Sequence, residues 1–308
     1  MSVSEHKSIE VNSALRSVDR GVAISLSSSF RGYYAHCGFL SALSRRGISP
    51  DRIAGSSSGA IAGLLYASGL RGDDMVDFIL QKGVTRSFFD WGFLYRLPGI
   101  LTFSFGTGLF SADGAVRFLK DRLGSPRLES FVCPALEISV TNLTLEESQV
   151  LSHGDAVELA IASCSVPGLF RARSYDGALL WDGGIANDIP FHHWLDDPSV
   201  HTIVIHSIRH SKGSLPVPRW PSMSRGIAIG HQLVSDQLNN HRRELAQLKG
   251  KRIIECITET KHPGWLNGQR AVLVQAGDKS GERAAELLLE INPLAKPVKE
   301  FAGSPHSD

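Results

Sequence analysis

The chain has 308 residues, of which 42% are apolar and 20% are charged, a balance typical of a globular protein with a substantial core. A formal net charge of +1 provides no global field for nucleic acid, so we expect no nucleic-acid partner. The sequence shows neither the apolar stretch of a signal peptide nor the roughly 18 apolar residues of a transmembrane helix. We therefore expect a cytoplasmic protein, with room for peripheral contact to a membrane.

Strands and helices alternate along the first quarter of the chain. Residues 1–19 are polar and predict a lead-in that precedes the folded domain. Short apolar runs predict buried strands, and longer runs with apolar residues at helical spacing predict helices. By these criteria we expect strands at 21–27 and 52–57, and helices at 33–47, 59–69 and 73–83.

The segment 84–110 interrupts this alternation. Eight aromatic residues fall between Phe88 and Phe110, out of 24 in the whole chain, and glycines and Pro98 interrupt any long periodic pattern. An aromatic-rich insertion can be a lid over a ligand groove, a surface that dips into a bilayer, or a cap on the core. Three nearby cations would suit anionic lipid: Lys82, Arg86 and Arg96.

The alternation resumes after the aromatic segment. We expect helices at 112–124, 155–164 and 235–250, and strands at 133–143, 147–154, 201–208 and 251–260. Strands that alternate with helices favour an α/β fold with a largely parallel sheet and helices on both faces. We see no internal repeat and no low-complexity linker, so we expect one domain over 20–292, followed by a tail at 293–308.

The cysteines and acidic residues give no metal signal. The four cysteines lie far apart and form no C-x-x-C pair, and scattered thiols of this kind are usually buried and reduced: Cys37, Cys133, Cys164 and Cys256. The acidic residues form no calcium-binding loop. We expect no metal site and no cofactor.

The stretch Gly55-Ser56-Ser57-Ser58-Gly59 matches the G-x-S-x-G pattern of a nucleophile elbow. In such an elbow a sharp strand-to-helix turn holds the central serine in a strained conformation, and large side chains two residues away would clash. An apolar strand is expected before the stretch and an apolar helix after it, which is the setting that the pattern requires. Ser57 is therefore a candidate nucleophile; the alternative is a serine- and glycine-rich turn that caps a helix.

A nucleophilic serine needs a base, and the chain offers two kinds of candidate. Histidine is the commonest partner, yet none after Ser57 lies in a loop of obvious catalytic character: His153, His192, His193, His201, His206, His210 and His231. The sequence LLWDGG is stronger, because Gly183 and Gly184 let backbone or substrate approach the Asp182 carboxylate closely. The alternative is an ordinary D-G hairpin turn, which is our assignment for Asp176.

Four motifs, taken in order, resemble those of the patatin-like phospholipase family. They are a loop that ends in Arg31-Gly32, the G-x-S-x-G elbow, the segment ASCSVPGLF at 162–170, and Asp182-Gly183-Gly184 followed by Asn187 and Pro190. Together they span residues 21 to about 210, nearly two-thirds of the chain. Any one of them could arise by chance, whereas four in the family's order hardly could.

The resemblance implies a three-layer α/β/α sandwich with a mainly parallel central sheet and a Ser–Asp dyad. It makes Ser57 the nucleophile and Asp182 the general base, with no histidine required. The implied reaction is hydrolysis of a phospholipid or another acyl-ester lipid, through an acyl-Ser57 intermediate that water attacks. Aspartate has an ordinary pKa of about 3.9, so burial, tight hydrogen bonding and the helix dipole would have to compensate for its weak basicity.

The oxyanion loop departs from the family pattern, which is usually the glycine-rich G-G-G-x-R/K-G. This chain has serine at 27, 28 and 29, and it keeps the arginine and the last glycine. By resemblance, the backbone N–H groups of this loop form the oxyanion hole: Ser28, Ser29, Phe30, Arg31 and Gly32. Serine has an N–H group too, but a positive φ would cost about 1 kcal/mol or more at each serine.

Two other functions compete with the hydrolase. Malonyl-type acyltransferases share a related sheet and elbow, but they use a histidine partner, and the DGG motif argues against one. A lipid-binding or regulatory protein with little turnover is the second alternative, because the serine-rich loop could impair the oxyanion hole. The presence of both Ser57 and Asp182 favours the hydrolase.

Overall fold

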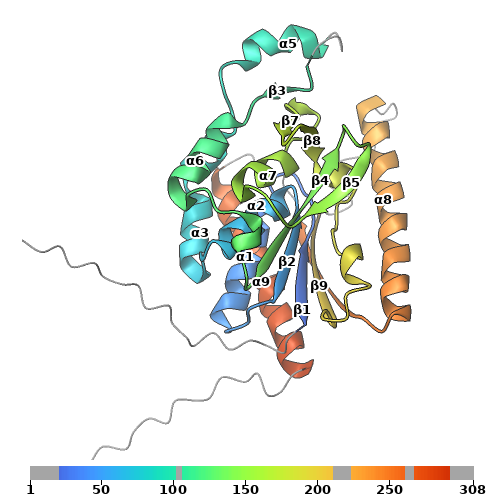
Figure 1. Cartoon of the computed structure of the whole chain (residues 1–308). Coiled ribbons are helices and arrows are strands. Elements are labelled where there is room, and N and C mark those ends of the chain that lie inside the picture. Colours follow the sequence, from blue (N-terminus) through green and yellow to red (C-terminus); the bar gives the residue numbers. More distant parts are fainter. Residues whose placement is uncertain (1–20, 102–105, 211–222, 261–266, 292–308) are drawn as a thin grey trace, which may run out of the picture.

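The computed structural model of the chain describes residues 21–101, 106–210, 223–260 and 267–291 (Figure 1). The lead-in expected at 1–19 and the tail expected at 293–308 lie outside the described residues. A mostly parallel central sheet has helices on both of its faces, so the three-layer α/β/α architecture predicted from the sequence is confirmed (Figure 1). Within the described ranges, no helix combines the length and the apolar character needed to cross a membrane.

The centre of the sheet is parallel. Five strands run side by side in the order β10-β9-β1-β2-β4: β1 (Val22–Leu26), β2 (Arg52–Ser56), β4 (Ala135–Asn142), β9 (Thr202–His210) and β10 (Arg252–Thr260). The inner strand β1 is buried along its whole length, which explains why its sequence is a continuous run without exposed polar positions. Three antiparallel strands extend the sheet beside β4: β5 (Glu147–Leu151), β7 (Arg173–Tyr175) and β8 (Ala178–Asp182).

Strands β2 and β8 lie end to end along one edge of β4. β2 pairs with the first five residues of β4, up to Ser139, and β8 pairs with the last three, from Val140, in the opposite direction. β5 overlaps both of these pairings and therefore occupies the other edge of β4. The carboxyl ends of β2 and β8 consequently meet near the middle of β4. This arrangement brings Ser57, which follows β2, close to Asp182, which ends β8.

Helices bury two separate cores against the sheet (Figure 1). The larger core holds apolar side chains of α1 (Tyr33–Arg45), α2 (Ser58–Ala67), α7 (Ala156–Ser163) and α9 (Asn267–Ile291). The smaller core, on the other face, is built around Phe191 and Trp194, and α8 (Met223–Leu248) contributes Ala246 to it. Both faces of the sheet are therefore apolar, as expected for parallel strands between two helical layers.

The following short elements connect the main strands and helices. They are α5 (Phe93–Leu101), α6 (Asp113–Leu123), the strands β3 (Gly108–Phe110) and β6 (Gly168–Phe170), and the 3₁₀ turns η1 (Leu128–Ser130), η2 (Gly183–Ile185) and η3 (His192–Trp194). β3 and β6 pair with each other in a separate two-stranded sheet. Asp176 and Gly177 form the tight turn between β7 and β8 with φ of 48° and 76°, so the hairpin turn assigned to Asp176 is confirmed.

Two predicted helices are corrected by the structure, and a third helix was missed. The helix expected at 73–83 is two helices, α3 (Gly72–Leu80) and α4 (Lys82–Ser87), because Gln81 between them has an extended backbone with ψ of 132°. The helix expected at 235–250 begins earlier, at Met223. No helix was predicted where α9 lies, and it packs so tightly on α1 that a Cβ at Gly277 would overlap the backbone of Ala35.

Candidate active site

Ser57 lies in the sharp turn between β2 and α2. Its backbone has φ of 51° and ψ of −115°, a region that costs a non-glycine residue about 1–3 kcal/mol. A Cβ at Gly55 would overlap the backbone of Gly59, and a Cβ at Gly59 would overlap the carbonyl group of Leu26. The turn therefore accepts no side chain at either glycine, and its strain is confined to the serine between them.

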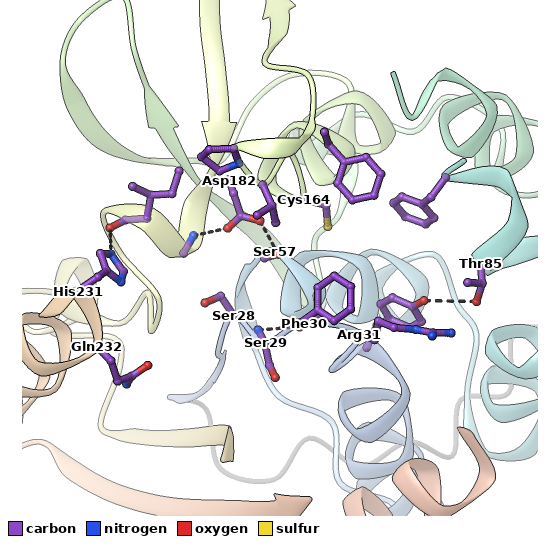
Figure 2. Close-up of a pocket in the computed structure, with 18 of the residues that line it drawn as sticks. Ser28, Ser29, Phe30, Arg31, Ser57, Thr85, Cys164, Asp182, His231 and Gln232 are labelled. Carbon is purple, nitrogen blue, oxygen red and sulfur yellow. Dashed lines mark hydrogen bonds between the residues drawn. The ribbon is translucent and has the colours of Figure 1, made fainter. Parts of the chain in front are cut away.

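The Ser57 and Asp182 side chains are hydrogen-bonded to each other (Figure 2). Ser57 Oγ donates to Asp182 Oδ2 at 2.7 Å, and the N–H group of Gly184 donates to Asp182 Oδ1 at 2.7 Å. A Cβ at Gly183 would overlap the backbone of β4, and a Cβ at Gly184 would overlap the side chain of Ser28. The two glycines let the chain turn tightly across the end of β2, and this turn holds the carboxylate against Ser57.

Burial controls the basicity of Asp182. Its side chain is 5% exposed, and burial raises the pKa of the carboxyl group from 3.8 to about 6, while the hydrogen bonds from Ser57 and Gly184 lower it. A pKa of about 6 leaves the group ionised at neutral pH and makes it a stronger base than an exposed carboxylate. Desolvation thus makes the Asp182 carboxylate more basic than an exposed aspartate.

Ser163 positions the elbow, and sequence reasoning assigned it no role. The Ser57 N–H group donates to Ser163 Oγ at 2.8 Å, and Ser163 Oγ donates to the Ser139 carbonyl at 2.6 Å. This hydroxyl therefore links the strained turn to the middle of β4, next to the point where β2 and β8 meet. The motif ASCSVPGLF contains Ser163, but its spacing alone does not distinguish a bridging hydroxyl from a packed one.

Replacing Ser163 by alanine is expected to lower kcat about tenfold with little change in KM, because the Ser57 N–H group loses its acceptor and the turn relaxes. An unsatisfied buried N–H group costs about 1–3 kcal/mol, so urea unfolding should show a loss of that size. Ser41→Ala is the matched control, because Ser41 Oγ is buried and donates to the Gly72 carbonyl at 2.8 Å, remote from the elbow. Equal kcat values for the two variants would contradict a positioning role.

The serine-rich loop adopts its shape without strain at the serines. Within residues 27–32 the positive φ falls at Arg31, at 57°, and not at any of the three serines. The conformational cost of a positive φ at serine therefore does not arise. The N–H group of Ser28 donates to the Asp188 carbonyl at 2.8 Å, and that of Ser29 donates to Ser58 Oγ at 3.2 Å. These two N–H groups are therefore engaged within the protein before any substrate binds.

An apolar cavity of about 680 Å³ opens beside the serine and the aspartate (Figure 2). Its polar lining includes Ser28, Ser57, Ser58 and Asp182, and its apolar lining consists of Phe30, Tyr33, Phe88, Phe89, Val166, Pro167, Phe170, Ile185 and Ile227. A cavity of this size with a mostly apolar wall and a few polar groups is typical of a ligand site. Across the described part of the chain, no cluster of histidine, cysteine or acidic side chains is arranged to hold a metal ion.

The histidines considered as bases make other contacts. His206 forms a buried pair with His36, their Nδ1 atoms lying 2.8 Å apart, and burial lowers the pKa of both rings, to about 4 for His36. His231 lines the cavity, but its Nε2 contacts the Ile185 carbonyl at 2.6 Å (Figure 2). Four other histidines do not line the cavity: His153, His192, His193 and His201. The side chain of His210 lies outside the described residues.

The cysteines differ in their surroundings. Cys37 and Cys256 are buried as expected, but Cys133 is exposed, because it lies in the turn that precedes β4. Cys164 lines the cavity, and burial, followed by the charge of Asp182, raises the pKa of its thiol well above the ordinary value. The Cys164 thiol therefore stays protonated and is a poor nucleophile.

The parallel sheet, the strained serine turn and the facing carboxylate place the chain among α/β proteins with a nucleophile elbow. A family model described as a patatin-like phospholipase matches residues 25–194, which is more than half of the chain. The chain belongs to the patatin-like phospholipase family, and the resemblance inferred from its motifs is confirmed.

Individual relatives match parts of the chain. An uncharacterized NTE family protein of Mycobacterium tuberculosis is 31% identical over 171 residues, which cover 55% of this chain and 44% of that protein. The lysophospholipase NTE1 of Candida glabrata is 31% identical over 158 residues, covering 51% of this chain and 9% of that protein. The crystal structure of VipD from Legionella pneumophila superposes with a TM-score of 0.49 at 15% identity, covering 87% of this chain and 67% of that one. The match thus spans less than half the length of the first two relatives.

Proposed function

We propose that the chain is a serine lipid acyl hydrolase in which Ser57 is the nucleophile and Asp182 the general base. The 2.7 Å hydrogen bond between Ser57 Oγ and Asp182 Oδ2, beside an apolar cavity, carries the proposal. Asp182 accepts the Ser57 proton as Oγ attacks the ester carbonyl, and it returns this proton to the departing alcohol oxygen. Water then attacks the acyl-Ser57 ester, with Asp182 again as the base, and the fatty acid leaves.

The negative oxygen formed in this attack would be stabilised at the start of α2. The first N–H groups of a helix have no intrahelical acceptor and carry partial positive charge. Ser58 directly follows the nucleophile in the first turn of α2, and its N–H group is our first candidate donor. The N–H groups of Ser28 and Ser29 already have acceptors, so these two residues would shape the loop rather than bind the oxyanion.

Hydrolysis of p-nitrophenyl butyrate and p-nitrophenyl dodecanoate, compared under identical conditions, tests the proposal. Each buried CH₂ group contributes about 0.8 kcal/mol, so the longer chain should lower KM at least about tenfold if it occupies the apolar cavity. A lysophospholipid with the same acyl chain should then be hydrolysed as well. If none of the three esters is cleaved above background, the hydrolase proposal fails.

One observation favours the alternative of a lipid-binding protein with little turnover. The N–H groups of Ser28, Ser29 and Gly32 are engaged, the last by the Ser29 carbonyl at 3.0 Å, which removes three of the donors that the family resemblance places in the oxyanion hole. Loss of one such donor lowers kcat about 10²–10³-fold in a serine protease. Lipid binding without hydrolysis would therefore support this alternative, whereas fast hydrolysis would exclude it.

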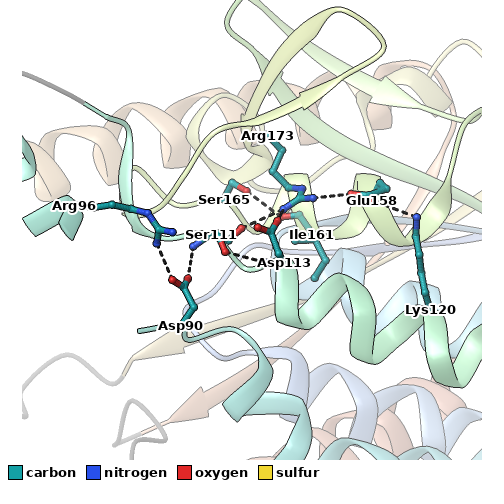
Figure 3. Close-up of polar contacts among 9 residues, drawn as sticks. All are labelled: Asp90, Arg96, Ser111, Asp113, Lys120, Glu158, Ile161, Ser165 and Arg173. Atoms are coloured by element: carbon teal, nitrogen blue, oxygen red, sulfur yellow. Dashed lines mark hydrogen bonds and ion pairs between the residues drawn. The ribbon is translucent and has the colours of Figure 1, made fainter. Parts of the chain in front are cut away.

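Polar contacts tie the aromatic segment to the body of the protein (Figure 3). Asp90 accepts hydrogen bonds from Arg96 at 2.9 Å and from the Ser111 N–H group at 2.7 Å. The Arg173 guanidinium donates to the Ser111 carbonyl at 3.1 Å and to Glu158 on α7 at 2.8 Å. The base of the segment is fixed by these contacts, whereas α5 projects away from the sheet (Figure 1). Arg96, considered as a lipid contact, is instead paired with Asp90.

The projecting part exposes large apolar side chains. Trp91 is 83% exposed, Tyr95 is 92% exposed and Leu101 is 69% exposed. Aromatic rings with one polar edge favour the boundary between water and hydrocarbon. Lys82 and Arg86 on the preceding helix α4 are also exposed and carry positive charge. We propose that this region makes peripheral contact with an anionic membrane surface.

The double substitution Trp91→Ser and Tyr95→Ser is expected to weaken binding to anionic phospholipid vesicles at least about tenfold, measured by co-sedimentation. Each lost aromatic contact is worth on the order of 1 kcal/mol, and a tenfold change corresponds to about 1.4 kcal/mol. Val132→Ser is the control, because Val132 is 85% exposed but lies outside the aromatic segment, in the turn before β4. If vesicle binding is weakened equally in the double variant and in Val132→Ser, or in neither, the segment 91–101 has no role in membrane contact.

A further inference from the structure

A chain of hydrogen bonds connects the core of the protein to the serine-rich loop. His36 on α1 and His206 on β9 are fully buried, and their Nδ1 atoms lie 2.8 Å apart. His36 Nε2 lies 2.9 Å from the carbonyl oxygen of Ser27, the first serine of the loop. His206 Nε2 lies 2.8 Å from Thr258 Oγ1 on β10, and this oxygen lies 2.8 Å from Ser280 Oγ on α9. The loop is thus connected to α1, β9, β10 and α9 through imidazole and hydroxyl groups.

The direction of each hydrogen bond follows from the carbonyl group at the end of the chain. The Ser27 carbonyl can only accept, so His36 Nε2 carries a proton. Burial lowers the pKa of both imidazoles, which are therefore neutral and carry one N–H group each. His36 Nδ1 must then accept from the Nδ1–H group of His206, and His206 Nε2 must accept from the Thr258 hydroxyl. Each ring nitrogen has one partner, and the tautomers of both rings are fixed.

These contacts hold one peptide group of the loop at both of its polar ends. The Ser27 carbonyl accepts from His36. The N–H group of the same peptide bond, which belongs to Ser28, donates to the Asp188 carbonyl at 2.8 Å. The peptide plane cannot rotate without breaking both hydrogen bonds. Because Ser28 lines the cavity beside Ser57, the orientation of this peptide controls how the loop faces the nucleophile.

We propose that His36 and His206 are positioning residues, which orient the peptide bond between Ser27 and Ser28 for the reaction at Ser57. This role rests on the proposed ester hydrolysis. Neither histidine lines the cavity, so both act through the loop and not on the substrate. Two apolar side chains would fill the same space without desolvating two imidazoles, but the Ser27 carbonyl would then lose this donor. The buried polar chain is therefore explained by the orientation that it gives to the loop.

Nitrogen NMR of the histidine rings tests the chain of hydrogen bonds without any hydrolysis. At neutral pH the ring nitrogen shifts should show the Nε2–H tautomer for His36 and the Nδ1–H tautomer for His206. Substitution of each histidine assigns its signals. The Nδ1–H tautomer in His36 would leave the Ser27 carbonyl without this donor and would overturn the proposal.

A matched pair of substitutions at His206 separates positioning from core packing. Asparagine places a side-chain N–H group where Nδ1 lies in histidine, whereas glutamine places one where Nε2 lies. His206→Asn should therefore keep the hydrogen bond to His36, and His206→Gln should lose it. We expect kcat for p-nitrophenyl butyrate to be about tenfold lower in His206→Gln than in His206→Asn, with equal KM. Both variants lose the stacking of the imidazole on Phe39, so urea unfolding should show similar losses of stability. Equal kcat values in the two variants would overturn the proposal.

Thr258→Val and Thr258→Ser form a second pair, which leaves both imidazoles in place. Valine keeps the shape of threonine but removes the hydroxyl, so His206 Nε2 loses its donor and the tautomer of His206 is no longer fixed. We expect kcat to fall about two- to fivefold in Thr258→Val and to return in Thr258→Ser, with KM unchanged in both. This pair decides the proposal if the His206 variants do not fold, and equal kcat values in it would then overturn the proposal.

Hydrogen exchange separates failure of the positioning role from failure of the hydrolase. The Ser28 amide should exchange at least about tenfold faster in His206→Gln than in His206→Asn, because the freed peptide opens more often from the Asp188 carbonyl. This measurement needs no turnover. Hydrolysis with one kcat in both variants would overturn the positioning role alone. Absence of any hydrolysis in the wild type would overturn the proposed activity, and equal exchange rates in the two variants would then overturn the role of the histidines in holding the loop.

Discussion

Ser57→Ala is expected to lower kcat/KM for p-nitrophenyl esters about 10⁴- to 10⁶-fold and to abolish covalent labelling by a fluorophosphonate probe. Removal of the nucleophile in a serine protease has an effect of this size, because what remains is the contribution of binding and oxyanion stabilisation. The residual rate should be independent of Asp182, since the aspartate then has no serine proton to accept. Mass spectrometry of the labelled wild type should place the adduct on Ser57.

The neighbouring serine provides the matched control for this experiment. Ser56 is buried, and its Oγ has no hydrogen-bond partner, so Ser56→Ala should fold and keep full labelling. Labelling that survives in Ser57→Ala would show that another residue reacts. Wild-type protein that takes up no probe would count against the hydrolase and for the lipid-binding alternative.

The motifs that contribute Ser57 and Asp182 could be found in the sequence, and the family resemblance implied that the two residues meet, but the strand register that brings them together could not be predicted. The tight turns at the elbow and at LLWDGG require glycine at fixed positions for local steric reasons. Such local requirements can be recognised in a single sequence. The 2.7 Å contact between Ser57 and Asp182 depends on β2 and β8 lying end to end along β4. That register joins strands more than 120 residues apart, and no local pattern encodes it.

The missed helix α9 has a physical explanation. Its sequence contains glycine at 268, 277 and 281, and each glycine inside a helix costs about 1 kcal/mol relative to alanine, so local propensity argues against a long helix. In the structure Gly277 and Gly281 face the backbone of α1, where a Cβ would overlap Ala35 and Phe39. The residues that weaken the local signal are therefore the ones that permit close packing, and tertiary contact outweighs propensity.

The oxyanion loop marks a further limit of sequence reasoning. Serine in place of glycine raised the question of strain at Ser28 and Ser29, and the answer depends on backbone torsions that a sequence does not state. The strain falls on Arg31 instead, and the serine N–H groups are engaged by Asp188 and Ser58. The three serines therefore fit the loop without backbone strain, and the N–H groups of Ser28 and Ser29 have acceptors within the protein.

Asp182→Asn is expected to lower kcat/KM about 10⁴-fold, with the protein folded. Asparagine keeps the size of the side chain but cannot accept the Ser57 proton, and substitution of the aspartate in a serine protease triad has an effect of this size. The loss should appear in kcat, because Asp182 is hydrogen-bonded to Ser57 Oγ and is not part of the apolar wall that would hold the acyl chain. Retention of more than about one-tenth of the activity would point to a different base.

The pH profile of the wild type should carry the signature of the same group. Asp182 must be ionised to accept a proton, and its pKa is about 6, so kcat/KM should fall about tenfold per pH unit below pH 6 and level off above it. An exposed aspartate would place this limb near pH 4. A profile that is flat between pH 5 and 7 would contradict a buried carboxylate base.

The same burial makes Asp182 unfavourable for the stability of the fold. A pKa raised from 3.8 to about 6 corresponds to about 3 kcal/mol. Well below pH 4 the carboxyl is protonated in both folded and unfolded chains, and the fold carries no penalty. Between about pH 4 and pH 6 the unfolded chain has released this proton while the folded chain still holds it, so the stability of the fold decreases across this window and levels off above pH 6. Asp182→Asn should remove this pH dependence of stability. At pH 8 its free energy of unfolding should exceed that of the wild type by about 1–3 kcal/mol, which thermal unfolding would show as a higher melting temperature. A variant that is both inactive and more stable would identify the buried charge as a feature retained for catalysis. A variant that is less stable than the wild type at pH 8 would mean that the hydrogen bonds from Ser57 and Gly184 stabilise the carboxylate by more than its desolvation costs.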